Sequence, residues 1–330
     1  MTRLSLKLNK YYNLSVVLVH FNIQQKAQMD YTVSDETYRR LVQMSHLQYT
    51  AKSHHLQWNV HQLSQICHHF YQKYCPDSFK HRRNVGLVKV SDTSLLVLLL
   101  LQAELGITSQ RHFYKICRLF PCGQLLERSR FNRRSRQLIW LVQLIRKAMS
   151  DILPSNRIAI IDSFPLPLCQ PVRNHRVAIF KGLADIGYNA SKHLWFYGFK
   201  VHMLVTLSGY ILNDLVTPAS VYDIKVVYEL LEGCKRSVIL GDLGYLSSEL
   251  KKDLEQLGYH LWTPFRQNMA GAEEHNDWKV MAMRRTIETR FSELCRLFDI
   301  EHTLARSLAG LQLRMEQIIL AHNLRYFKMN

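Results

Sequence analysis

Three carboxylates stand where an ionised group is unexpected. Asp162 directly follows the aliphatic run Ile158–Ile161, and Asp242 follows a second short apolar run, Ser237–Leu240, after one glycine. Such unbroken runs, without polar alternation, predict strands buried on both faces. Glu288 lies in a long amphipathic stretch, at a helical position that is partly directed toward the core.

Carboxylates that meet at one point cannot all stay ionised without cations, because burial and like charge both disfavour the ionised form. Two divalent ions about 4 Å apart would satisfy them and would activate a water or a 3′-hydroxyl for in-line phosphoryl transfer. Oxygen ligands favour Mg²⁺, with Mn²⁺ as a substitute. We therefore expect Asp162, Asp242 and Glu288 to be metal ligands and catalytic residues.

Each carboxylate also has a simpler interpretation. Asp162 and Asp242 are favoured turn residues, the first before Pro165 and the second before Gly244. Glu288 is spaced to pair with Arg284 at i,i+4 on one helix face. The three positions taken together, two at strand ends and one in a helix, favour the shared site.

The elements that must position these carboxylates form a mixed α/β pattern. Two aromatic and β-branched runs on either side of Ser208-Gly209 predict a β-hairpin. The expected order is strand 157–163, hairpin strands 195–207 and 209–219, helix 222–231, strand 237–240, helix 247–257, strand 259–265, a long helix 279–298 and a last helix near 307–327.

The chain's charge is unevenly distributed. Residues 1–150 hold 22 Lys and Arg against 7 Asp and Glu, whereas residues 151–330 hold 21 against 19. A basic part joined to a near-neutral part predicts that the first binds a polyanion, such as nucleic acid or an anionic membrane surface. Seven scattered cysteines without a C-x-x-C pair indicate a reducing, cytoplasmic setting. No apolar run reaches the ~20 residues of a membrane span. We expect nucleic acid, and not a membrane, as the partner of the basic part.

The basic part reads as helical from 29 to 150, after a basic, acid-free arm at 1–28. The predicted helices Leu95–Leu105 and Gln110–Phe120 flank a Gly-containing turn, which is the outline of a helix-turn-helix, although many helical hairpins share it. An arginine-rich run follows and suits phosphate contacts, which position a protein without specifying sequence; a solvated basic face is the alternative. The candidate DNA-binding residues here are Arg111, Lys115, Arg118, Arg128, Arg130, Arg133, Arg134 and Arg136.

Five segments in order resemble the insertion-sequence 982 family of DDE transposases. They are I-D-S-F-P-L-P-L-C (161–169), F-Y-G-F-K-V-H (196–202), V-T-P-A-S-V-Y-D (216–223), G-D-L-G-Y (241–245) and R-R-T-I-E-T-R-F-S-E-L (284–294), and the resemblance covers most of 30–327. It implies a ribonuclease H-like catalytic core in residues 151–330, within an α+β chain, with its triad on Asp162, Asp242 and Glu288. The chain departs from the family where Leu243 replaces an expected Lys. It also carries Met281 and Cys295 where the Y-R-E-K pattern of a neighbouring family has Tyr and Lys.

The resemblance implies a transposase that cuts and joins DNA strands at the ends of an insertion sequence with Mg²⁺. It also implies double-stranded DNA as partner, both terminal inverted repeats and target, and action as a homodimer or higher multimer near the bacterial nucleoid. Lys200, His202, Arg284 and Arg285 are the further candidates for DNA contacts. Two alternatives stay open: a catalytically inactive DNA-binding protein derived from a transposase, and a ribonuclease H-like nuclease that cleaves without joining.

Overall fold

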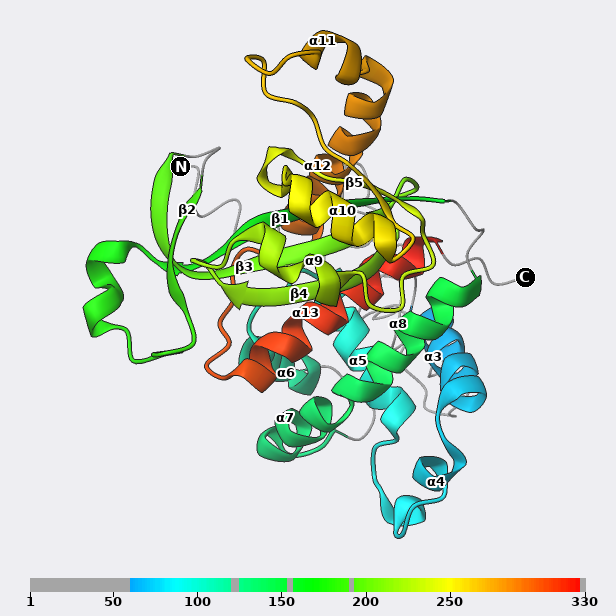
Figure 1. Cartoon of the computed structure of the whole chain (residues 1–330). Coiled ribbons are helices and arrows are strands. Elements are labelled where there is room, and N and C mark those ends of the chain that lie inside the picture. The colour runs from blue at the N-terminus through cyan, green and yellow to red at the C-terminus, as the bar shows by residue number, and fades with distance from the viewer. Residues whose placement is uncertain (1–59, 120–124, 153–156, 190–192, 327–330) are drawn as a thin grey trace, which may run out of the picture. The chain divides into compact units, whose positions relative to one another are not determined.

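The computed structural model describes residues 60–119, 125–152, 157–189 and 193–326 (Figure 1). The chain divides into two compact units, one ending at Leu141 and the other running from Val142 to Lys328. The arm 1–28 and the start of the helical region lie outside the described residues. The expected division of function at residue 150 stays a prediction.

The first unit is helical. Its elements are α3 (Val60–Tyr74), α4 (Asp77–Lys80), a 3-10 turn (Val85–Leu87), α5 (Asp92–Glu104), α6 (Gln110–Leu119), α7 (Arg128–Gln137) and the beginning of α8 (Ile139–Ile152). Ser91 caps α5 by accepting the Ser94 N–H at 3.0 Å, and Ser109 caps α6 by accepting the His112 N–H at 3.1 Å. Gly106 turns the chain between the two helices with φ of 59°, a conformation that favours glycine. The predicted helix–turn–helix outline is therefore present.

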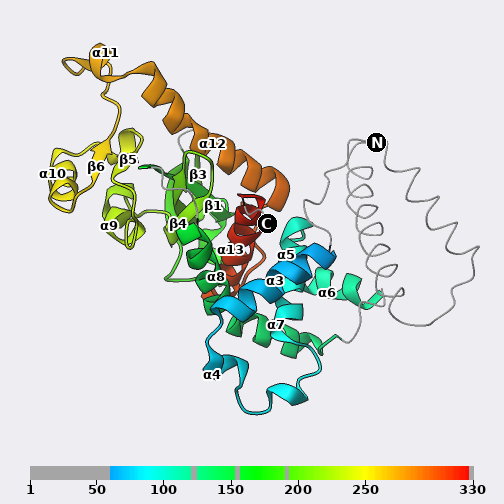
Figure 2. The same cartoon turned by 90° about the vertical axis from the view of Figure 1, so that its right-hand side faces the viewer.

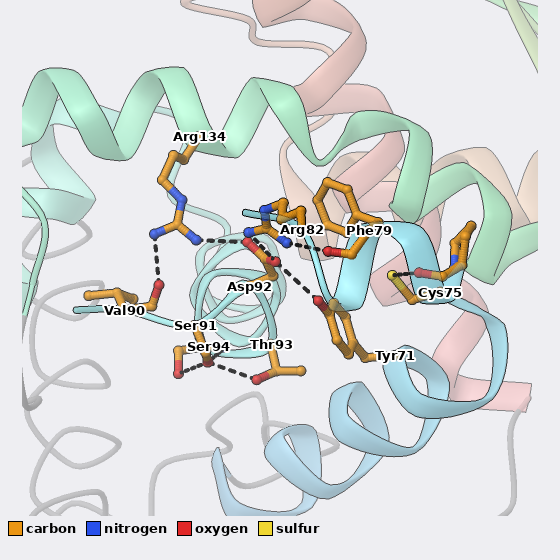
Figure 3. A network of polar contacts seen from close by, with 11 residues as sticks. Tyr71, Cys75, Phe79, Arg82, Val90, Ser91, Asp92, Thr93, Ser94 and Arg134 are labelled. Atoms are coloured by element: carbon orange, nitrogen blue, oxygen red, sulfur yellow. Dashed lines mark hydrogen bonds and ion pairs between the residues drawn. The ribbon is translucent and has the colours of Figure 1, made fainter. Parts of the chain in front are cut away.

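One buried carboxylate ties this unit together (Figure 3). Asp92 is 5% exposed and lies 2.7 Å from the guanidinium groups of both Arg82 and Arg134. The Tyr71 hydroxyl donates to Asp92 at 3.2 Å, and Arg134 also donates to the Val90 carbonyl at 2.7 Å. A buried carboxylate needs such partners, because an unpaired charge in the interior is costly. Arg134 thus serves the fold of this unit.

The second unit is built on a six-stranded mixed sheet with the order β2-β3-β1-β5-β6, in which β4 also pairs with β3. Strand β3 runs antiparallel to β1, β2 and β4. Strand β5 runs parallel to both β1 and β6. This arrangement confirms the expected mixed α/β class of the second unit. The strands are β1 (Ile158–Cys169), β2 (Asp185–Asn189), β3 (Leu194–Thr206), β4 (Ile211–Pro218), β5 (Val238–Leu240) and β6 (His260–Trp262).

Helices cover both faces of this sheet (Figure 2). On one face α9 and α10 pack on Ile161, Leu204 and Tyr245, all of them fully buried. On the other face α12 places Phe291 against Phe164 of β1, with ring centroids 4.8 Å apart. The helices of this unit are α9 (Val227–Leu230), α10 (Ser248–Gln256), α11 (Ala272–His275), α12 (Trp278–Phe298) and α13 (Leu308–Asn323), and the second half of α8 joins them.

The prediction that the first strand ends at residue 163 is wrong, because β1 continues to Cys169. Its register with β3 extends along its whole length, from Ala159 opposite Thr206 onward. Its pairing with β5 stops at Ile160, so the prolines at 165 and 167 need no donor on that side. Asp162 therefore sits inside a strand.

Strand β2 was not predicted from the sequence, which indicated no strand between 163 and 195. It is short, and Gly187 is its one buried residue. A Cβ at position 187 would lie 2.7 Å from Ala219, so glycine permits the close approach that holds the strand in the sheet. The predicted hairpin about Ser208-Gly209 is confirmed as β3 and β4. The predicted helix 222–231 is two pieces, a 3-10 turn (Asp223–Val226) and α9.

No helix in the described part of the chain has both the length and the apolar character needed to cross a bilayer.

Candidate active site

Asp162 is held on the α12 face of the sheet. It pairs with Met203 of β3, and its side chain is 15% exposed. Burial, and after it the nearby Asp242, raise the pKa of this carboxyl to about 7, although the Ser163 N–H that donates to Oδ1 at 2.7 Å opposes the shift. The protein has thus placed an acidic group where only a cation or a proton would stabilise it.

Asp242 reaches the same place through the parallel pairing of β1 and β5. Ile160 of β1 lies opposite Leu240, the last residue of β5. Asp162 stands two residues further along β1, and Asp242 stands two residues beyond the end of β5, in extended backbone. The two carboxylates are close enough that Asp242 raises the pKa of Asp162. Asp242 accepts the Gly244 N–H at 2.9 Å, and burial together with Asp223 raises its pKa.

A third carboxylate, Asp223, was missed as a site residue in the sequence. It follows β4, and it accepts a hydrogen bond from the Ser163 hydroxyl at 3.2 Å and from Lys200 Nζ at 3.0 Å. Its charge also raises the pKa of both Asp162 and Asp242. Asp223 does not follow an aliphatic run, so the signal that marked the other two was absent. It does close the segment 216–223 that carries the family resemblance.

Gly244 shows how tightly these groups are packed. A Cβ built on it would lie 3.0 Å from Asp242 Oδ1 and 3.3 Å from Asp223 Oδ2. A side chain at 244 would therefore push both carboxylates apart.

We expect Gly244→Ala to weaken Mn²⁺ binding by about 10- to 100-fold, the usual effect of disturbing groups that orient metal ligands. Isothermal titration with Mn²⁺ measures this affinity. Gly86→Ala is the control for a glycine replacement that leaves the site alone, because a Cβ there meets nothing within 4 Å and the backbone is not left-handed. Equal Mn²⁺ affinity in Gly244→Ala and the parent would show that the carboxylates tolerate separation.

Glu288 reaches Asp162 only through Arg284. Its side chain is 55% exposed, because Ile287 takes the buried position on α12. Arg284 contacts Glu288 Oε1 at 2.6 Å and Asp162 Oδ2 at 3.6 Å. The ion pair between Arg284 and Glu288, which the sequence offered as the simpler interpretation, is therefore present. The expectation that Glu288 points partly toward the core is wrong, because its side chain is exposed. The guanidinium bridges the two carboxylates.

The donor chemistry of this cluster suits a divalent cation that prefers oxygen. Carboxylate oxygens of Asp162, Asp242 and Asp223 are the ligand type for Mg²⁺ or Mn²⁺, and their shared repulsion is what a cation would relieve. Within the described ranges, no three acidic, histidine or cysteine side chains stand close enough to enclose an ion as they are placed. Tyr245 lies nearby with a buried hydroxyl, and burial and the three aspartates raise its pKa.

The other candidate DNA contacts of this unit differ in their accessibility. His202 is fully buried, with Nε2 2.9 Å from Thr217 Oγ1 and Nδ1 3.5 Å from Asp223. Burial lowers its pKa to about 4, so it is neutral at pH 7 and its interpretation as a phosphate contact is wrong. Lys200 is engaged with Asp223, Arg284 with the carboxylates, and Arg285 is exposed on α12.

In the helical unit, three of the predicted basic residues lie along the exposed side of α6: Arg111, Lys115 and Arg118. The arginine-rich run is the helix α7, with Phe131 and Ser135 buried. Its exposed arginines are Arg128, Arg130, Arg133 and Arg136. Arg134 is the exception: its guanidinium is bound by Asp92 and by the Val90 carbonyl, so it does not point to solvent as the other four arginines do.

Comparison with solved structures found transposases at low similarity. A cryo-EM structure of the piggyBac transposase synaptic complex with hairpin DNA shares 12% identity at a TM-score of 0.40, over 80% of this chain and 76% of that one. The Mos1 mariner paired end complex with Mn shares 11% at a TM-score of 0.21, over 96% and 98%. A pre-cleavage Mos1 transpososome shares 10% at 0.21, over 96% of each chain. These scores carry no argument for function.

A comparison with curated proteins gave no match. The family model described as the transposase DDE domain matches residues 154–308, which include β1, β5 and all four acidic residues discussed above. Residues 154–308 are therefore similar to the DDE domain of transposases.

Proposed function

We propose that this protein is a transposase that cleaves and joins DNA strands at the ends of an insertion sequence, with insertion-sequence 982 as its family. The observation that carries the proposal is the pair Asp162 and Asp242, which adjacent parallel strands place side by side within the region that matches a DDE domain. Two buried carboxylates with raised pKa values form a site prepared for cations.

In this proposal Asp162 and Asp242 hold Mg²⁺, or Mn²⁺ as a substitute, and Glu288 completes the ligand set. Bound divalent ions would activate a water or 3′-hydroxyl and stabilise the leaving oxygen. Lys200 balances the charge of Asp223, which in turn lies beside the neutral His202. Arg284 keeps Asp162 and Glu288 together before cations bind.

The helical unit supplies the contacts to double-stranded DNA in this proposal. Exposed cations on α6 and α7 neutralise phosphates of the terminal inverted repeats or of the target. The protein acts as a homodimer or higher multimer on paired ends, in the cytoplasm at the nucleoid. The strong basic balance of residues 1–150 supports this assignment.

Two neighbouring arginines on α7 are expected to behave oppositely. Arg133→Ala, at an exposed position, should weaken DNA binding at every sequence and reduce the salt slope of log K by about 1. Arg134→Ala should leave that slope unchanged but destabilise the fold by about 1.5–3 kcal/mol, because Asp92 loses one of its two cationic partners and keeps Arg82. Binding isotherms at several salt concentrations and urea unfolding measure the two effects. The same slope loss in both variants would contradict the internal role of Arg134.

A joining assay tests the function. The full-length protein is incubated with a pre-cut DNA end bearing a 3′-OH and a supercoiled plasmid, with Mg²⁺ or with chelator. We expect end-to-plasmid joining with Mg²⁺ alone, and none with Asp242→Asn. Plasmid nicking without joining would indicate the nuclease instead. Binding that never nicks, even in Mn²⁺, would indicate the inactive DNA-binding protein.

A further inference from the structure

Two large aromatic side chains stand exposed at one edge of the sheet. Tyr188 of β2 and Trp195 of β3 lie directly opposite each other in the strand register. Their ring centroids are 5.1 Å apart at an interplanar angle of 51°, and the residues are 47% and 61% exposed. Figure 1 shows this hairpin at the end of the sheet away from β5 and β6. We call Tyr188 and Trp195 the aromatic pair.

The segment that covers the neighbouring aromatic residues of β3 does not cover the aromatic pair. Further along the same face of β3, Tyr197 and Phe199 are buried and contact Phe180 of the segment before β2. Phe180 and its segment do not extend over Trp195, which stays exposed. The Tyr188 hydroxyl lies 3.2 Å from Nδ1 of His193, and this hydrogen bond restrains the Tyr188 ring. Fixed aromatic rings on a surface lose little conformational entropy when a ligand stacks on them.

The segment between β1 and β3, which includes Tyr188, is cationic. Between β1 and β3, residues 170–193 hold four Lys and Arg against a single acid, Asp185. Three of these cations are exposed: Arg173, Arg176 and Lys181. The Asp185 carboxylate is engaged by Ser220 and by the Ile186 N–H at 2.8 Å. Positive charge beside exposed aromatic rings is the pattern that binds a nucleic acid strand through both its phosphates and the faces of its bases.

The aromatic pair shares a sheet face with the candidate active site. Trp195 and Met203 are eight residues apart on β3, so alternation puts both on the same face, and Met203 is the partner of Asp162. The separation along the strand is about 26 Å at ~3.3 Å per residue. A DNA strand passing over Asp162 could therefore extend to the aromatic pair.

We propose that Tyr188 and Trp195 form a stacking platform for an unpaired nucleobase of the DNA on which this protein acts. The proposal rests on the proposed function. The 5.1 Å gap between the rings is too narrow to hold a base, which needs about two stacking steps of ~3.4 Å. The base therefore stacks on the outer face of Trp195, and Tyr188 supports the indole from the other side.

The test uses the full-length protein in chelator, so that no strand is cut. Fluorescence titrations compare a blunt duplex with the same duplex carrying an unpaired 2-aminopurine. We expect the parent to prefer the unpaired probe and to quench its fluorescence. Trp195→Ala should reduce that preference by about 5- to 150-fold and abolish the quenching. Trp195→Phe should retain most of both, because an aromatic face remains.

Tyr228→Ala is the matched control, since this tyrosine of α9 is 45% exposed but lies away from the aromatic pair in the fold. Its preference and quenching should equal the parent's. Unchanged preference and quenching in Trp195→Ala would overturn the platform, as would equal binding of both probes by the parent, and in either case the transposase proposal stands. A parent that binds neither probe would refute both proposals.

Discussion

Asp162→Asn is expected to lower the rate of strand joining by about a thousandfold, because the loss of a metal ligand removes several kcal/mol of transition-state stabilisation. The same change should make the metal-free protein more stable at pH 8, by about 2–4 kcal/mol. Burial raises the pKa of this carboxyl to about 7, so ionising it at pH 8 costs free energy in the folded state that it does not cost in the unfolded state. Urea unfolding and a quantitative joining assay measure the two effects.

The pH dependence follows from the same shift. A raised carboxyl pKa means that the folded state holds its proton more tightly than the unfolded state does. The contribution of Asp162 to the parent's stability should therefore fall as pH rises from about 4 to about 7, and Asp162→Asn should remove that contribution from the slope. At pH 8, Mg²⁺ at a hundred times its Kd should stabilise the parent by about 2.7 kcal/mol, but the variant much less.

Asp151→Asn is the control for this prediction, because that carboxylate is 53% exposed and paired only with Lys235 at the surface. It should change neither the joining rate nor the pH slope. A stability of Asp162→Asn at pH 8 equal to or below the parent's would show that the Asp162 carboxylate is not strained by burial.

Arg146→Met is expected to destabilise the protein by about 3–5 kcal/mol, the cost of leaving buried charges without their partner. Arg146 of α8 forms an ion pair with Asp214 of β4 and lies 3.5 Å from Glu316 of α13, and all three side chains are less than 10% exposed. Burial raises the pKa of Glu316 to about 7, and Arg146 is the cation that opposes this shift. Denaturant unfolding at pH 8 measures the loss.

Lys147→Met, at the next position of α8 but exposed, is the matched control and should change stability by less than about 0.5 kcal/mol. The loss in Arg146→Met should shrink at pH 5, because protonated Glu316 no longer needs a cation. A loss below about 1 kcal/mol at pH 8 would show that water reaches the two carboxylates and replaces the guanidinium.

The elements around the site were largely predictable, because their signals are local. Aliphatic runs indicated β1 and β5, the Ser208-Gly209 turn indicated the β3–β4 hairpin, and the period of apolar residues indicated α12. Strand β2 was not, since its place depends on the approach of Gly187 to Ala219, a contact between distant segments. The extent of β1 was missed for a similar reason, because its partner strand decides where a proline is tolerated.

The sequence alone determined which residue types were available at the site: two carboxylates after aliphatic runs, a third on a helix, and a basic first half. Only the tertiary structure decided which of them meet. Parallel pairing of β1 with β5 brings Asp162 beside Asp242, and packing brings in Asp223, while Arg284 stands between Asp162 and Glu288. The tertiary structure also buries His202 and pairs Arg134 with Asp92. Charge and burial at a point depend on neighbours that are distant in the chain, and no local pattern records them.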